Sequence, residues 1–175
     1  MNIEKILNNN PYIISDTHFL HENITKYANR PENWTEILLT NWNDLVKEKD
    51  YILILGDLFL GTKKNIRYFL ELNPLNGKKI LLIGNHDKFS DGFYNSIGIQ
   101  TIRNFNQNDG IIKNAFIYKN IIFSHYPWIP IPNDMYNIHG HVHNHDFIRK
   151  ENRHINVCVE KLDYCPIRLK DILNG

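Results

Sequence analysis

Seven side chains of the kinds that bind divalent metals are spread along this chain in five short motifs. The motifs are Ser15-Asp16-Thr17-His18, Gly56-Asp57, Gly84-Asn85-His86-Asp87, Ser124-His125 and Gly140-His141-Val142-His143. They offer carboxylate, amide and imidazole groups without a cysteine, a donor set suited to manganese, iron, zinc or nickel, and also to magnesium. The sequence therefore predicts a site for two divalent ions, with manganese as the first expectation.

Each motif follows a short apolar run, as expected if the run is a β-strand and the motif lies at the end of that strand. The runs cover residues 12–14, 51–55, 80–83, 121–123 and 136–138. Most are bounded by glycine or polar residues, which is typical of buried strands. Functional residues of open α/β sheets gather at the carboxyl ends of strands, so we expect the motifs to meet there.

The charge of such a centre favours an anionic ester. Two divalent ions carry +4, Asp16 and Asp57 lower this to +2, and a bridging hydroxide leaves +1. A metal pair also lowers the pKa of a shared water and orients phosphoryl oxygens. We therefore expect hydrolysis by a metal-bridging hydroxide, with His86 as the acid that protonates the leaving oxygen and Asp87 as its orienting partner.

The order of these motifs resembles the calcineurin-like metallophosphoesterase superfamily. Further likeness to small, cap-less bacterial and phage members lies in Ser15-Asp16-Thr17-His18-Phe19, Arg30-Pro31, Asn41-Trp42-Asn43 and Tyr164-Cys165-Pro166. The resemblance implies a four-layer α/β/β/α sandwich of two mixed β-sheets flanked by helices. It also implies that one metal takes Asp16, His18, the bridging Asp57 and His143, and the other takes Asp57, Asn85, His125 and His141.

Spacing of apolar residues predicts the elements that carry the motifs. Helices are expected over residues 34–46 and 66–72, so the first half reads strand-helix-strand-helix-strand, as in a parallel sheet. Short strands near 99–103, 111–118, 121–124, 136–139 and 154–159 favour an antiparallel or mixed second half. The proline-rich residues 126–132 predict a loop beside His125, and 166–173 a closing short helix. We expect one domain over residues 1–175.

Composition and charge limit the classes of partner and the cellular location that we expect for this protein. A formal net charge of +1 gives no general attraction for nucleic acid, and Lys63-Lys64, Lys78-Lys79 and Arg149-Lys150 read as ordinary surface. No apolar run is long enough for a membrane span and no secretory signal is evident, so a cytoplasmic bacterial or phage-encoded protein is expected. The two cysteines, Cys158 and Cys165, read as reduced structural thiols apart from the ligand motifs.

Some assignments remain open at the level of sequence. His21 and Asn23 lie close enough to the first motif to touch substrate, or they begin an exposed segment; Arg30 is either a phosphate clamp or a surface ion-pair partner. His139 and His145 extend the histidine series without making a third metal site. The expected substrate is a small phosphodiester, such as a cyclic nucleotide or nucleotide derivative. A phosphomonoesterase is the alternative, a nuclease fits less well, and a non-catalytic metal-binding scaffold is the rival of another class.

Overall fold

A computed structural model describes residues 2–107, 110–145 and 153–174 of the protein. The Arg149-Lys150 pair lies outside these residues. The helices are α1 (Ile3–Asn8), α2 (Ile24–Tyr27), α3 (Trp34–Leu45), α4 (Lys63–Leu72), α5 (Asp91–Ser96), the 3₁₀ helix η1 (Val159–Lys161) and α6 (Leu169–Asn174). In the described part of the chain, none of them is long and apolar enough to cross a lipid bilayer.

The strands form two mixed sheets and one hairpin. The five-stranded sheet has the order β11 (Ile167–Arg168), β1 (Tyr12–Ile14), β2 (Tyr51–Ile54), β3 (Lys78–Leu82), β4 (Ile99–Ile102). The four-stranded sheet has the order β10 (His154–Asn156), β9 (Tyr136–His139), β8 (Ile121–Ser124), β7 (Ala115–Tyr118). The hairpin pairs β5 (Asn104–Gln107) with β6 (Gly110–Lys113).

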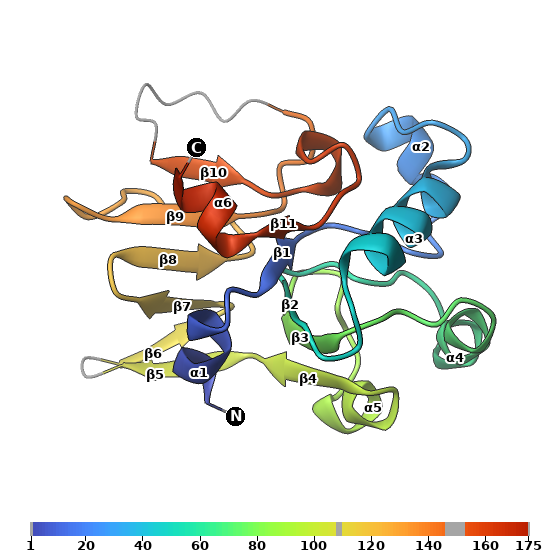
Figure 1. Ribbon diagram of the computed structural model, residues 1–175, viewed down its shortest axis with the longest axis horizontal. Coiled ribbons are helices and arrows are strands. Elements are labelled where there is room, and N and C mark those ends of the chain that lie inside the picture. Colours follow the sequence, from blue (N-terminus) through green and yellow to red (C-terminus); the bar gives the residue numbers. More distant parts are fainter. Residues whose placement is uncertain (1, 108–109, 146–152, 175) are drawn as a thin grey trace.

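Both sheets are mixed, as expected. In the first sheet, β1 to β4 pair in parallel and β11 runs antiparallel to β1. In the second, β8, β9 and β10 pair in parallel and β7 is antiparallel to β8. Helices α2 to α5 lie on one side of the first sheet and the second sheet lies on the other (Figure 1). The predicted architecture of two mixed sheets flanked by helices is confirmed.

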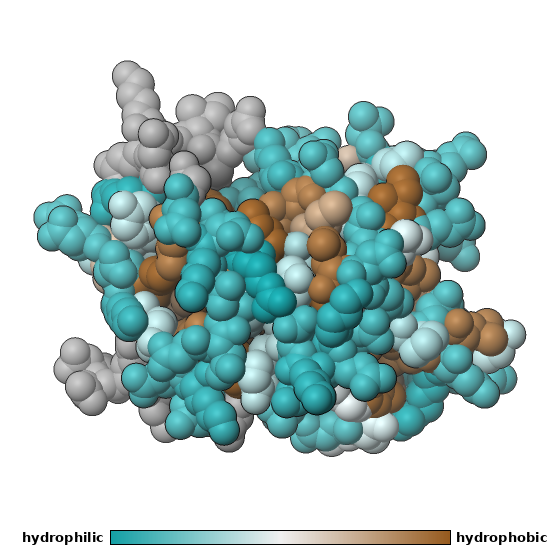
Figure 2. Space-filling model, viewed as in Figure 1, coloured by the Kyte–Doolittle hydropathy of each residue, from teal (hydrophilic) through white to brown (hydrophobic). Residues whose placement is uncertain are grey.

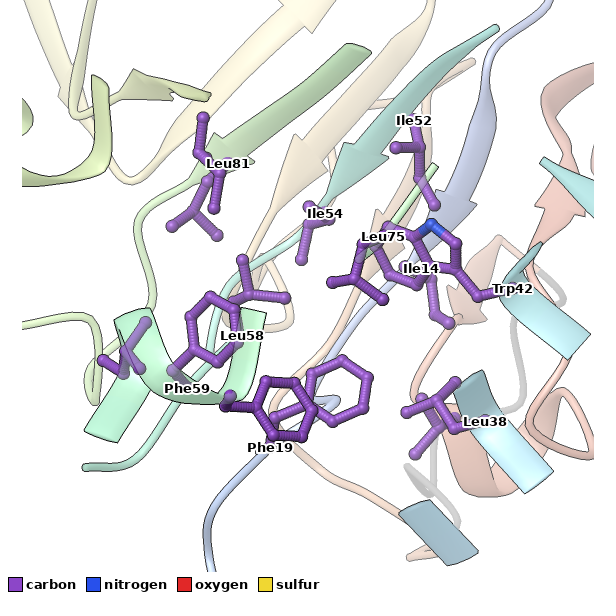
Figure 3. Packing of buried hydrophobic residues seen from close by; sticks show 14 of the residues in the cluster. Ile14, Phe19, Leu38, Trp42, Ile52, Ile54, Leu58, Phe59, Leu75 and Leu81 are labelled. Atoms are coloured by element: carbon purple, nitrogen blue, oxygen red, sulfur yellow. The ribbon is translucent and has the colours of Figure 1, made fainter. Parts of the chain in front are cut away.

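One hydrophobic cluster fills the space between the helices and the first sheet. Trp34, Leu38 and Trp42 recur every four residues on α3 and are buried, which is the helical spacing that the sequence predicts. They pack with Ile14 and Ile54 from the sheet (Figure 3). Trp42 also donates from its indole nitrogen to the carbonyl of Asn76, at 3.0 Å. This packing fixes the strands whose carboxyl ends carry the first three motifs.

A second cluster lies between the two sheets. It joins Ile13, Leu53 and Leu82 of the first sheet to Phe116 and Phe123 of the second. The phenyl rings of Phe116 and Phe123 stack with centroids 4.9 Å apart. Helices α1 and α6 add side chains to the same cluster. The two sheets are therefore held face to face by buried apolar contacts, and the remaining motifs on the second sheet are brought against those on the first.

The second half of the chain differs in detail from the sequence prediction. Residues 99–102 form β4, which joins the first sheet in parallel after the short helix α5. The expected strand at 111–118 is two strands, β6 and β7, divided at Asn114, whose φ is 52°. A left-handed residue interrupts a strand, and sequence spacing does not show it. Residues 126–132 form the predicted loop without regular structure.

Candidate metal centre

The ends of five strands bring the motifs together. Asp16 and His18 follow β1, Asp57 follows β2, and Asn85 and His86 follow β3, all at the carboxyl edge of the parallel sheet. His125 follows β8, and His141 and His143 follow β9, at the matching edge of the second sheet. Parallel neighbours end at the same edge, so five segments distant in sequence converge on one place.

Five of the seven predicted ligands have a backbone in the left-handed region. Their φ angles are 56° for Asp16, 50° for His18, 56° for Asp57, 72° for His141 and 50° for His143. Such conformations cost about 1–3 kcal/mol each outside glycine and concentrate at functional sites. The surrounding fold must therefore stabilise an otherwise unfavourable loop geometry, which turns these side chains inward.

Two glycines make room for the carboxylates. A Cβ atom at Gly84 would collide with the Asp57 carboxylate and lie 2.7 Å from the Asp57 nitrogen. A Cβ atom at Gly140 would collide with Ser15 Oγ and the Asp16 carboxylate. The motifs Gly-Asn-His-Asp and Gly-His-x-His thus need glycine because the ligand of another strand occupies the space where a side chain would lie.

The first cluster consists of Asp16, His18 and His143, whose donor atoms lie within 4.8 Å of one another. His18 Nε2 is 3.7 Å from Asp16 Oδ1, and His143 Nε2 is 4.0 Å from the same oxygen. Burial opposes ionisation of Asp16, yet the neighbouring imidazoles of His18, His125 and His143 hold the pKa of its carboxyl well below the ordinary value. Asp16 is thus an anion in a fully buried position.

The second cluster consists of Asp16, Asp57 and His125, with Asn85 beside them. His125 Nδ1 lies 2.8 Å from the carbonyl oxygen of Leu55, which only accepts, so this nitrogen carries the proton. In the neutral ring, Nε2 then presents a lone pair 2.7 Å from Asn85 Oδ1 and 3.5 Å from Asp57 Oδ2. Three lone pairs converge there, and a cation would satisfy all of them.

Buried polar atoms at the centre fit a divalent ion. Asp16 Oδ1 and both ring nitrogens of His18 are buried without a hydrogen-bond partner in the described part of the protein. Such atoms cost free energy unless a partner completes them. Asp57 Oδ2 of the second cluster lies 3.5 Å from His125 Nε2 and also 3.6 Å from His18 Nε2 of the first cluster. Asp57 therefore reaches both clusters, and Asp16 belongs to both.

His141 lies at the edge of the second cluster. Its backbone N–H donates to Asp16 Oδ2 at 2.8 Å, and its ring centroid is 5.1 Å from that of His125. Burial lowers the pKa of its imidazole, which favours the neutral form that binds metal. The structure therefore gathers all seven expected ligands, while the two tightest groups contain Asp16, His18, Asp57, His125 and His143.

His86 and Asp87 have separate environments. The backbone N–H of His86 donates to Asp57 Oδ1 at 2.8 Å, and the partly exposed His86 places its ring 5.3 Å from the His18 ring. Asp87 instead accepts backbone N–H groups from Asp57, Leu58 and Gly84 at 2.7, 3.1 and 2.9 Å. This corrects the expectation that Asp87 orients the His86 ring: its carboxylate fastens the loop after β2 to the loop after β3. Burial raises the pKa of Asp87 to about 6.

Comparison with known proteins agrees with this geometry. The model of the calcineurin-like phosphoesterase family matches residues 11–171. The chain belongs to this family. It is 38% identical to the uncharacterized protein MJ1445 of Methanocaldococcus jannaschii, covering 90% of this chain and 86% of that protein. It is 32% identical to the gene 66 protein of Mycobacterium phage L5, covering 45% of this chain and 40% of that protein.

A solved structure from Aquifex aeolicus, of the protein of unknown function AQ665, has a similar fold. The TM-score is 0.64 at 28% sequence identity, covering 93% of this chain and 97% of that chain. The fold of this calcineurin-like phosphoesterase is therefore shared nearly end to end with an experimentally solved protein. Family membership establishes a metal-dependent phosphoesterase framework, for which the two clusters are the candidate ligand sets.

Glu160 belongs to this phosphoesterase site and was missed by sequence reasoning. Its Oε1 lies 3.0 Å from His143 Nδ1, so Nδ1–H donates to it and Nε2 faces Asp16. Burial opposes its ionisation, but His143 and Arg30 keep the pKa of Glu160 below the ordinary value. The available signal was the apolar stretch before it, Val157-Cys158-Val159, which ends on an acidic residue much as the five motifs do.

Arg30 supports Glu160 from inside the protein. Its Nε donates to Glu160 Oε1 at 2.8 Å, and its terminal nitrogens donate to the carbonyls of Thr17 and Asp16 at 2.8 and 2.6 Å. The side chain is fully buried. The expectation of a phosphate clamp is therefore corrected, because the guanidinium is occupied in holding the first metal-binding loop.

Cys158 is also part of the site, against the expectation that the cysteines lie apart from it. Its buried thiol donates to Asp16 Oδ2, with the sulfur 3.3 Å away. Burial raises the pKa of this thiol well above the ordinary value, so it is neutral. Cys158 thus helps to orient Asp16 as a hydrogen-bond donor. Sequence spacing could not show this, because 142 residues separate the two.

The remaining histidines and Asn23 differ in their burial, and His21 lies beside a ligand ring. The His21 ring is 5.5 Å from that of His18, while Asn23 is exposed just before α2. His139 is buried with its ring 5.7 Å from that of His154, and His145 is exposed. Within the described ranges, neither His139 nor His145 falls in a metal-binding group. A substrate contact by His21 or Asn23 stays a prediction.

Proposed function

We propose that this protein is a binuclear metal-dependent phosphoesterase that prefers small phosphodiesters. The observation that carries the proposal is the convergence of buried, unpartnered ligand atoms of Asp16 and His18 beside Asp57, with the half-exposed His86 next to them. Asp16, His18, Asp57 and His143 would hold one ion, and Asp57, Asn85, His125 and His141 the other. Manganese is the first candidate among the metals that oxygen and nitrogen donors accept.

Two divalent ions, when bound, supply Lewis-acid activation of water and stabilisation of charge on the phosphoryl oxygens. The chain supplies the proton for the leaving alcohol. The backbone N–H of His86 donates to Asp57, its ring lies beside that of His18, and the residue is partly exposed. Burial lowers the pKa of His86, which makes its protonated form the stronger acid.

Three features support a diester. A diester carries one negative charge, which suits the +1 expected for the loaded centre. Its alcohol leaving group needs one proton, and His86 is one acid. The site is also open, because Asn85 is exposed and His141 and His143 are partly exposed. Cyclic nucleotides and nucleotide derivatives are the small diesters we propose, in a cytoplasmic setting. The alternative within the same chemistry is a phosphomonoesterase.

A scaffold without catalysis is the rival of another class. That reading needs a decayed site, with ligands or the acid lost. Here the seven expected ligand residues are present, and Glu160 and Cys158 hold His143 and Asp16 in place. Maintaining strained, buried ligands with dedicated partners costs stability, which favours an intact catalytic centre over a relic.

Metal-dependent hydrolysis of bis-p-nitrophenyl phosphate, compared with p-nitrophenyl phosphate, tests the proposal. The protein is stripped with a chelator and then titrated with Mn²⁺. Diester cleavage that appears only with metal supports the proposal, and a preference for the monoester replaces it with the phosphatase alternative. Metal binding without turnover of either ester contradicts the enzyme reading and favours the scaffold.

A further inference from the structure

Tyr126 connects the metal centre to a neighbouring cavity. It follows His125, and its ring centroid lies 4.2 Å from that of His141 and 5.0 Å from that of His125. Although it packs on two expected ligands, 45% of its surface remains exposed. An exposed aromatic ring in contact with metal-binding residues is placed where a substituent of a bound ester would pass.

The cavity next to Tyr126 is small, and its lining combines aromatic, apolar and polar residues. Its volume is about 260 Å³, and it is lined by Tyr126, Trp128 and Ile129 together with Asn114, Ala115, Ser124 and Pro127. Ile129 is 48% exposed, so the cavity opens to solvent. Sites for drug-sized ligands run from about 300 to 1,000 Å³, so this one suits a single flat ring system. Its lining, given by the described residues, has no charged side chain, which does not suit a second phosphate.

The backbone of this loop is fixed by a buried polar network. Asn137 is fully buried and accepts the Trp128 N–H on Oδ1 at 2.7 Å. Its Nδ2 donates to Ser124 Oγ at 2.8 Å, and Ser124 Oγ donates to the Tyr126 carbonyl at 2.6 Å. The backbone at the two aromatic positions is therefore held in place before any ligand arrives, which lowers the entropy cost of binding.

We propose that Tyr126 and Trp128 form an aromatic shelf, defined by these two residues, that stacks on the nucleobase of a nucleotide-derived phosphodiester. The proposal rests on the proposed function, and it adds the residues that would recognise the base of the substrate. A nucleobase has a flat, uncharged π-face with polar edges, which matches two aromatic side chains and the Asn114 amide. The contact of Tyr126 with His141 and His125 places a base on this shelf within one nucleotide of the metal ligands.

Two esters with one leaving group test the shelf. Thymidine 5′-monophosphate p-nitrophenyl ester and methyl p-nitrophenyl phosphate both release p-nitrophenol, and they differ in the group that the shelf would bind. In the wild type we expect a higher kcat/KM for the thymidine ester. Trp128→Ala is expected to lower the ratio of the two kcat/KM values about five- to a hundredfold while the methyl ester rate stays within about twofold. Trp128→Phe should keep most of the ratio.

Control variants distinguish a loss of base binding at the shelf from a loss of hydrolysis at the metal centre. Tyr68→Ala removes an exposed aromatic ring on α4, away from the cavity lining, and should leave the ratio unchanged. Trp128 is preferred over Tyr126 because Tyr126 packs on ligand residues. An unchanged ratio in Trp128→Ala, with the methyl ester still hydrolysed, overturns the shelf and leaves the proposed function standing.

If the wild type hydrolyses neither ester, the proposed function fails. The shelf is then tested by measuring nucleotide binding instead of turnover. Calorimetric titration of the metal-free protein with thymidine 5′-monophosphate measures the contact without turnover. Weaker binding by Trp128→Ala than by the wild type and by Tyr68→Ala supports the shelf. Equal binding by all three proteins, or no binding by the wild type, overturns it.

Discussion

At the scale of single residues, Asp57 is the carboxylate that we expect to contact both metal ions. Its carboxylate lies 3.6 Å from His18 Nε2 and 3.5 Å from His125 Nε2, so it is close to one histidine of each ligand group. Asp57→Asn keeps the shape and removes the charge, so we expect activity to vanish and metal retention to fall from two ions towards one. Metal analysis after gel filtration measures the stoichiometry. The exposed Asp44→Asn serves as control, and two retained ions in Asp57→Asn would contradict a bridging role.

His86 is expected to separate chemistry from metal binding. Because its ring is half-exposed and outside the ligand groups, His86→Ala should retain both metals and lose about 10²- to 10⁴-fold in kcat. Single-turnover kinetics on the diester, with the metal content measured in parallel, is the test. His145→Ala removes an exposed imidazole as a matched control. Full activity in His86→Ala would refute its assignment as the acid.

Glu160 is expected to act through His143. It holds the Nδ1–H of that ring, so Glu160→Gln should weaken metal affinity about 10- to 100-fold. Competition against a chromophoric chelator measures this affinity without an activity assay, and Glu71→Gln on α4 is the exposed control. Unchanged affinity in Glu160→Gln would show that the bond to His143 does not position a ligand.

Residue types and order predicted which side chains would meet, and did not predict how they are held. Asp16, His18 and Asp57 were found because each motif follows a strand. Cys158 was missed because its partner Asp16 lies 142 residues away. Glu160 was missed because its contacts with His143 and with the distant Arg30 form only in the folded protein. Arg30 was misread because sequence does not show whether an arginine points inward.

At the scale of elements, strand ends and their glycines decide whether the ligands fit. Gly84→Ala places a methyl group against the Asp57 carboxylate, so we expect about 1–3 kcal/mol of destabilisation and weaker metal binding. In Gly92→Ala, on α5, the new Cβ meets only Ser90 Oγ at 3.9 Å, and helix propensity should stabilise slightly. Thermal unfolding of both variants is the measurement. Equal melting temperatures would contradict the close approach.

Sequence patterns predicted some of the helices and strands correctly and left the pairing of others open. Strands β1 to β3 and helices α3 and α4 were predicted because their apolar spacing has one clear period. Strand β4 was predicted at the right residues, but its parallel place beside β3 was not, since that pairing depends on the connection through α5. The left-handed φ angles of Asp16, His18 and His143 follow from tertiary contacts rather than from their types.

At the scale of the whole molecule, two hydrophobic clusters hold the sheets and helices together. They span both sheets and are built from the chain's own apolar side chains, so we expect the metal-free protein to fold. The face of the molecule in Figure 2 is mostly hydrophilic, with apolar residues appearing in several separate places. Such a surface agrees with a protein that buries most of its apolar side chains in these two clusters.

Metal should nevertheless raise the unfolding temperature. An ion that binds only the folded state stabilises it by about 2.7 kcal/mol at a hundred times its Kd. For a chain of this size that corresponds to about 5–10 °C per site. Calorimetry of stripped and Mn²⁺-loaded protein tests this, with Asp57→Asn showing a reduced shift. A stripped protein without a cooperative transition would contradict the expectation that the metal-free protein folds.

The pairing of β11 with β1 has a consequence for biosynthesis. Strand β1 is flanked by β2 on one side and by Ile167 and Arg168 on the other, and 125 residues separate Asp16 from His141. While the chain is still emerging from the ribosome, β1 keeps an open edge and its two ligands lack their histidine neighbours from the second sheet. The complete ligand sets therefore exist only after the second sheet and β11 have been made, and we expect ion capture to follow that point.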